Sequence, residues 1–156
     1  MPAQLPSVDK TPTDSPEGMK RTLASLLIWL TLAASPAFAQ DWALNGFDPV
    51  SYFSVGRAVP GEPDIATRWR GKSWHFSTEE NRLKFESNPR AYAPGFGGFC
   101  PVSLAEGKRI PGDPRQFVVI GQRIYLLRSA SAARQLMADP RGVLTSARRT
   151  WMQMAK

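Results

Sequence analysis

The sequence predicts an α+β fold in which a small antiparallel sheet carries packed helices within a single domain. Two pairs of β-prone segments supply the sheet, at 65–70 with 72–76 and at 117–120 with 123–127, and a short glycine-containing turn separates the members of each pair. The helices follow from capping residues and proline stops placed after each pair. This alternation of sheet and helix in a short chain predicts one domain with one core.

The first 39 residues are expected to lie outside that domain. Residues 19–39 have the three zones of a secretory signal peptide: a basic start at Lys20-Arg21, an apolar run too short to cross a bilayer, and small residues before Gln40. We therefore expect export to the periplasm and no transmembrane segment after cleavage. Residues 1–18 form a polar extension, either a non-native start ahead of Met19 or a disordered tail.

The net charge and the number of cysteines limit the expected partners and the means by which the domain is stabilised. The formal net charge is +7, and residues 40–156 carry all of it, mostly as scattered arginine that predicts a solvated surface rather than a nucleic-acid stripe. The single cysteine, Cys100, excludes an internal disulfide. The domain 40–156 must therefore be stabilised by its apolar core alone, and nucleic acid is not an expected partner.

The first elements of the domain are expected to be turns and strands. Asn45-Gly46 and Asp48-Pro49 are turn formers, and the β-prone segment 50–53 behind them predicts a short strand. Glycines and prolines make 54–64 a loop. In the strand 72–76 that follows, alternation directs His75 to the face opposite its two aromatic neighbours.

A helix and a glycine-rich turn come next. Ser77 followed by Glu80 is a capping-box pattern, which predicts a helix over 78–87 that Asn88-Pro89 ends. Beyond it, the aromatic and glycine residues of 92–99 predict a tight turn that delivers Cys100.

The second half is predicted to hold a hairpin and two helices. Gly121-Gln122 fits a two-residue hairpin connection. One helix begins after Ser129 and ends at Asp139-Pro140, and an amphipathic helix from Val143 onward is expected to dock on the domain. We identify no internal repeat in residues 40–156.

Two stretches carry a resemblance to a known family. They read NGFDPVSYF and WHFSTEENRLKFESNPRAYAPGFGGFC, and their order of turns, aromatic strand, helix and Gly-Gly-aromatic-Cys turn closely resembles the YHS domain in its secreted bacterial form. The later PGDPRQFVVIGQRIYLL fits the closing strands of that family. The resemblance implies an α+β fold and a link to metal handling. Where metal-trafficking members have cysteines, this chain has Ser51, Ser77 and Asn81.

The remaining candidate metal ligands are His75, Cys100 and Asp48, with Asp64 and Glu79 as further possible oxygen ligands. Copper and zinc are the candidate metals. Imidazole and thiolate together suit such metals if the fold brings them into one place. Each residue also has a structural interpretation. His75 fits a half-exposed strand residue, Cys100 a buried and inert thiol, and Asp48 a turn former that satisfies local amides.

The sequence thus leaves three functions open. The first is an exported, non-enzymatic binding module linked to metal handling. The second is a module for a small ligand or a partner protein, whose pocket is formed without metal by the residues Tyr52, Phe96, Gly97, Gly98 and Phe99. The third is a thiol enzyme in which His75 activates Cys100, although no motif supplies an oxyanion hole.

Overall fold

The computed structural model describes residues 41–154, within a compact unit that runs from Gln40 to Lys156. The expected extension 1–18 and signal peptide 19–39 lie outside the described residues. The fold is α+β as predicted, but the strands form two separate two-stranded antiparallel sheets instead of one. Between residues 41 and 154, no helix has the length and apolar character needed to cross a membrane.

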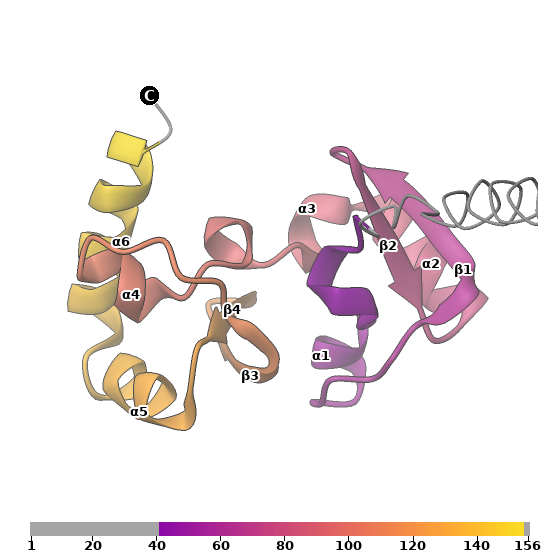
Figure 1. The fold of residues 1–156 in the computed structure, drawn as a ribbon. Coiled ribbons are helices and arrows are strands. Elements are labelled where there is room, and N and C mark those ends of the chain that lie inside the picture. Colours follow the sequence, from indigo (N-terminus) through magenta and orange to yellow (C-terminus); the bar gives the residue numbers. More distant parts are fainter. Residues whose placement is uncertain (1–40, 155–156) are drawn as a thin grey trace, which may run out of the picture. The chain divides into compact units, whose positions relative to one another are not determined.

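Six elements occur twice in the same order (Figure 1). The first set consists of a 3-10 turn η1 (Ala43–Gly46), α1 (Ser51–Ser54), β1 (Glu62–Trp69), β2 (Lys72–Phe76), α2 (Glu79–Ser87) and α3 (Pro89–Tyr92). The second set consists of η2 (Gly95–Gly98), α4 (Pro101–Ala105), β3 (Asp113–Ile120), β4 (Arg123–Leu127), α5 (Ala130–Ala138) and α6 (Pro140–Met154). We call these sets the first and second repeats.

The two hairpins have the same register, including the same irregularity. In the first repeat Glu62 pairs with Phe76, a bulge follows, and pairing resumes at Ala66. In the second repeat Asp113 pairs with Leu127, and pairing resumes after a bulge at Phe117. β1 and β3 each have 8 residues, and β2 and β4 each have 5. Because a bulge is a local departure from regular pairing, its recurrence at one position indicates copies of a single unit.

The turns before the hairpins repeat as well. Gly61 N donates to Gly46 O at 2.8 Å, and Gly112 N donates to Gly98 O at 2.9 Å. The sequence around these glycines reads GFDPVS and later GFCPVS, then VPGEP and later IPGDP. The expectation that residues 40–156 contain no repeat was wrong. Identity is limited to such short segments and to Pro89-Arg90 with Pro140-Arg141 at the starts of α3 and α6. Most other positions in the strands and helices differ, so apolar periodicity does not reveal the duplication.

Two local expectations also need correction. Residues 50–53 were expected to form a strand, but α1 is helical, because Asp48 Oδ1 accepts a hydrogen bond from Val50 N at 2.8 Å and Ser51 Oγ donates to Asp48 O at 2.7 Å. These local side-chain bonds override β propensity. The cap of α2 is Thr78, whose Oγ1 accepts from Asn81 N at 3.1 Å, so the predicted capping box at Ser77 is one residue out of place.

The two repeats meet through a small core. Phe47, Tyr52 and Ile124 form a buried cluster, and the Tyr52 ring packs edge-on against Phe117 with centroids 4.7 Å apart. The Tyr52 hydroxyl donates to Pro114 O at 3.0 Å. This contact joins α1 of the first repeat to the hairpin of the second.

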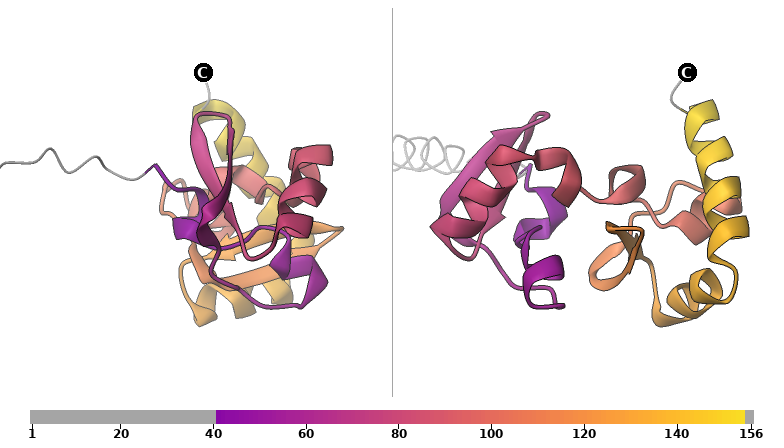
Figure 2. Two further views of the ribbon diagram at one scale, coloured as in Figure 1. Left: turned by 90° about the vertical axis from the view of Figure 1, so that its right-hand side faces the viewer. Right: turned by 180° about the vertical axis from the view of Figure 1, so that it is seen from behind.

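Within residues 41–154 there is no third hairpin for the second repeat to pack on. Its α4, the equivalent of α1, packs against α6 instead (Figure 2). Leu104 occupies the position equivalent to Tyr52 and is fully buried, and α6 contributes the buried Ala147. The longer final helix therefore closes the second repeat, and it confirms the expectation of a terminal helix docked on the domain.

Candidate functional site

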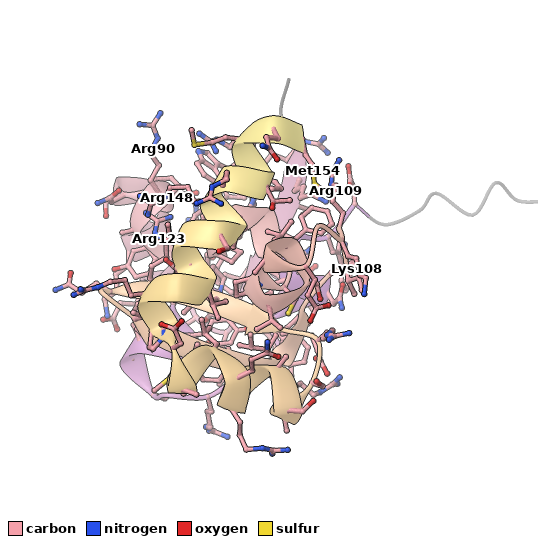
Figure 3. All side chains as sticks on the ribbon, turned by 90° about the vertical axis from the view of Figure 1, so that its left-hand side faces the viewer. Arg90, Lys108, Arg109, Arg123, Arg148 and Met154 are labelled. Atoms are coloured by element: carbon pink, nitrogen blue, oxygen red, sulfur yellow. The ribbon has the colours of Figure 1, made fainter. Side chains whose placement is uncertain are left out.

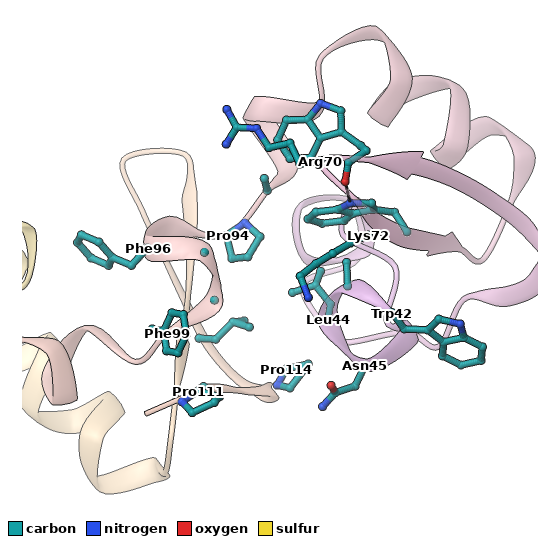
Figure 4. A pocket seen from close by; sticks show the side chains of 18 of the residues that line it. Trp42, Leu44, Asn45, Arg70, Lys72, Pro94, Phe96, Phe99, Pro111 and Pro114 are labelled. Atoms are coloured by element: carbon teal, nitrogen blue, oxygen red, sulfur yellow. Dashed lines mark hydrogen bonds between the residues drawn. The ribbon is translucent and has the colours of Figure 1, made fainter. Parts of the chain in front are cut away.

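A cleft of about 680 Å³ lies between the two repeats (Figure 4). Its walls include the equivalent turns η1 and η2, through Leu44 with Asn45 and Phe96 with Gly97. All four residues have left-handed backbone conformations, with φ values of 54°, 51°, 53° and 62°. The duplicated turn thus presents tightly folded backbone to the cleft from both repeats, and the volume lies in the range of small-molecule sites.

Aromatic side chains supply much of the apolar lining. Trp69 and Trp74 from the first hairpin pack edge-on with centroids 5.6 Å apart, and Trp74 Nε1 donates to Trp69 O at 3.0 Å. From the second repeat, Phe99 lies against Trp151 of α6 with centroids 5.8 Å apart. Arg109 lies over the Phe99 ring at 4.9 Å. These contacts fix the rings before any ligand binds.

The charge lining the cleft is positive. Arg70, Lys72, Arg90 and Arg123 line it, and no Asp or Glu does. Figure 4 shows the Lys72 side chain directed toward the space between the repeats. Its amine also forms an exposed ion pair with Asp41 Oδ1 at 3.3 Å. Since exposed ion pairs are weak, the cleft favours ligands with negative charge over cations.

The glycine-aromatic turn predicted from the sequence is part of this site. Phe96, Gly97, Gly98 and Phe99 all line the cleft. Tyr52, the fifth predicted pocket residue, lies instead in the core between the repeats. Burial raises the pKa of its phenol, with a smaller contribution from the negative charges of Asp113 and Asp48. Its role in the structure is to join the repeats.

His75 is buried, and protein groups already contact both of its ring nitrogens. Nε2 lies 3.1 Å from Ser73 Oγ, and Nδ1 lies 3.3 Å from Glu62 O. The ring also packs on Trp42 at a centroid distance of 4.3 Å. The expected half-exposed position is therefore not observed, because the segment before η1 covers this side of the strand.

Asp48 is fully buried, and its carboxylate accepts four hydrogen bonds. Val50 N donates to Oδ1, and the Ser77 amide, the Ser77 hydroxyl and Asn81 Nδ2 donate to Oδ2 at 2.9, 2.7 and 2.7 Å. Every one of these groups directs a hydrogen toward the carboxylate. Such a shell stabilises a buried negative charge but leaves little room for a cation.

Cys100 is fully buried in the apolar core of the second repeat, where it clusters with Val102, Tyr125, Leu127 and Leu136. No interaction in residues 41–154 joins it to His75, which belongs to the first repeat. Throughout these residues no three His, Cys, Asp or Glu side chains gather as a metal site would require. A thiol enzyme also needs a base beside the thiol, and the one histidine of the sequence, His75, belongs to the other repeat.

Sequence reasoning missed the part of the cleft contributed by the first repeat. Trp42, Leu44 and Lys72 were not singled out, yet all three line it. The missed signal is the repeat itself. Once GFDPVS and GFCPVS are aligned, the predicted turn around Phe96 has an equivalent around Leu44.

Comparison of the chain with family models, curated proteins and solved structures finds no match.

Proposed function

We propose that this protein is a non-enzymatic module that binds a small organic ligand with a flat apolar body in the cleft between its repeats. The observation that carries the proposal is a cleft of about 680 Å³ walled by aromatic rings and by the two equivalent turns. Export through residues 19–39 would make this a periplasmic binding module.

The composition of the lining supports a binding role. Most of the lining residues are apolar or aromatic, and the positive charges stand among them. Sites for small organic ligands combine apolar walls with a few polar groups that fix orientation. Glycine at Gly97 and Gly98 removes side chains from η2, and the Trp151 ring lies close to the backbone of Gly97, where a Cβ would meet it at 3.4 Å.

The geometry favours this function over metal handling, which the YHS resemblance implies. A copper or zinc site built from His75 and Cys100 would have to break the existing contacts of the imidazole and expose a fully buried thiol. Binding in the cleft needs no such rearrangement. The same burial of Cys100 disfavours a thiol enzyme.

Phenylnaphthylamine, an uncharged fluorescent dye with flat rings, is a suitable first probe. We expect saturable binding of one dye per chain. The variant Ala93→Trp fills the cleft, because Ala93 lines it, and should weaken binding about tenfold or more. Ala91→Trp is the matched control, since Ala91 is exposed and does not line the cleft. Absence of saturable binding, or equal effects of the two variants, would contradict the proposal.

A further inference from the structure

A second cavity adjoins the cleft. It has a volume of about 250 Å³ and is lined by Gly95, Phe96, Arg123, Tyr125 and Arg148. Phe96 and Arg123 line both cavities. Figure 4 shows the Phe96 ring on the side of η2 that faces away from Lys72, so the two cavities lie on either side of this turn. The two cavities therefore meet at Phe96 and Arg123.

The second cavity repeats a feature of the cleft. Four of its residues have equivalents in the first repeat, and every one of these equivalents lines the cleft: Gly95 corresponds to Ala43, Phe96 to Leu44, Arg123 to Lys72 and Tyr125 to Trp74. Each repeat thus builds the same cradle from a left-handed turn, a cation at the first residue of the second strand, and an aromatic ring two residues further on.

The two cradles differ in charge. In the first, Asp41 partly neutralises Lys72. In the second, α6 adds Arg148 beside Arg123 (Figure 3). None of the ion pairs formed within residues 41–154 involves either arginine. Two guanidinium groups that line one small cavity repel each other unless an anion lies between them.

We propose that the second cradle binds the acid group of the ligand, so that the ligand is an organic oxyanion whose apolar body lies in the cleft. This inference rests on the proposed function. Guanidinium groups bind carboxylate, sulfonate and phosphate through paired, charge-assisted hydrogen bonds. The Tyr125 side chain adds a phenol to the lining of this cavity, and a phenol can donate a further hydrogen bond to an oxyanion.

The test compares two dyes that share one ring system. Anilinonaphthalene sulfonate carries an oxyanion, and phenylnaphthylamine lacks it. We expect the sulfonate to bind the purified protein about tenfold more tightly, consistent with one charge-assisted contact. Arg123→Gln and Arg148→Gln should each remove this preference, and Arg148→Gln should leave the affinity for the uncharged dye unchanged, because Arg148 does not line the cleft. Lys72→Gln, at the equivalent position of the first repeat, should keep it.

The outcomes separate the two proposals. If the uncharged dye binds and the sulfonate binds no more tightly, ligand binding in the cleft is supported and the proposed oxyanion site is wrong. If Lys72→Gln removes the preference as fully as Arg123→Gln, charge in general attracts the dye and the assignment of the cradle is wrong. If neither dye binds, the proposed function fails, and the oxyanion site fails with it. Near-ultraviolet circular dichroism of each variant verifies its fold.

Discussion

Asp48 and Cys100 occupy equivalent positions in the two repeats, and both side chains are fully buried. Each precedes a Pro-Val-Ser segment that leads into a short helix, α1 from Ser51 and α4 from Pro101. Around Asp48 the first repeat supplies Ser77 and Asn81 as hydrogen-bond donors, whereas around Cys100 the second repeat supplies apolar side chains. The same buried position is therefore stabilised by hydrogen bonds in the first repeat and by apolar packing in the second. This relationship gives both residues structural roles.

The first prediction concerns the carboxylate. Asp48→Asn replaces an oxygen that accepts hydrogen bonds with an amide that donates, so at least one donor in its shell loses its partner. We expect the free energy of unfolding, measured by urea denaturation, to fall by about 2–4 kcal/mol. Asp64→Asn on exposed β1 is the matched control and should change it by less than about 0.5 kcal/mol. A similar small change for Asp48→Asn would refute its structural role.

The second prediction concerns the thiol. Because Cys100 is fully buried, Ellman's reagent should react with the native protein far more slowly than with the same protein in denaturant. The reaction is followed by absorbance at equal protein concentration in the two solutions. Rapid reaction of the native thiol would show that Cys100 is accessible, and would reopen both the metal and the enzyme alternatives.

The third prediction uses equivalent glycines. A methyl group at Gly61 would lie 2.5 Å from the carbonyl carbon of His75, and one at Gly112 would lie 2.5 Å from that of Leu126. Because the obstacle is backbone in both cases, Gly61→Ala and Gly112→Ala should each lower the free energy of unfolding by about 1–3 kcal/mol. Gly121→Asn is the control, since Gly121 has open space and asparagine tolerates its φ of 58°. Unequal costs at the two sites would argue against strict equivalence of the repeats.

The fourth prediction concerns alkaline pH. Burial raises the pKa of Tyr52 above its ordinary value of 10.0, so the folded state holds this proton more tightly than the unfolded state. The stabilisation is fully present below pH 10 and is lost as the pH rises above it. Thermal unfolding is measured at pH values from about 8 to about 11. The melting temperature should fall more steeply with pH in the wild type than in Tyr52→Phe. An equal dependence on pH in the two proteins would contradict the assignment of this effect to the Tyr52 phenol.

The fifth prediction concerns metals. Titration with copper or zinc, followed by desalting and metal analysis, should leave no retained equivalent that depends on both His75 and Cys100. The physical reason is that the imidazole already has two neighbours and the thiol is buried in the other repeat. One retained equivalent that disappears in both His75→Ala and Cys100→Ser would restore the metal function.

The sequence predicted those elements that depend on local chemistry. The strand Lys72–Phe76, the two-residue turn at Gly121-Gln122 and the turn before Cys100 were all confirmed. Residues 50–53 were misassigned, because a hydrogen bond from Val50 N to the side chain of Asp48 decides their conformation, and such a bond is not visible in β propensity. The turn was predicted correctly because glycines and aromatic residues mark it directly.

The site was predicted only in part, for a different reason. Phe96 and Phe99 stood out because they flank glycines, but Lys72 and Arg123 look like ordinary exposed residues at the start of a strand. Their significance comes from their equivalence and from the cavity that they share with the turns. Neither feature follows from local patterns, since both depend on how the two repeats pack.

The most direct test of the ligand site is a backbone-amide NMR titration of the protein with anilinonaphthalene sulfonate. Binding between the repeats predicts that the largest chemical-shift changes occur in η1, in η2 and at Arg123, while α2, which does not line the cleft, changes little. Large changes confined to α2 or to other surfaces away from both turns would contradict the central claim that the cleft between the repeats binds the ligand.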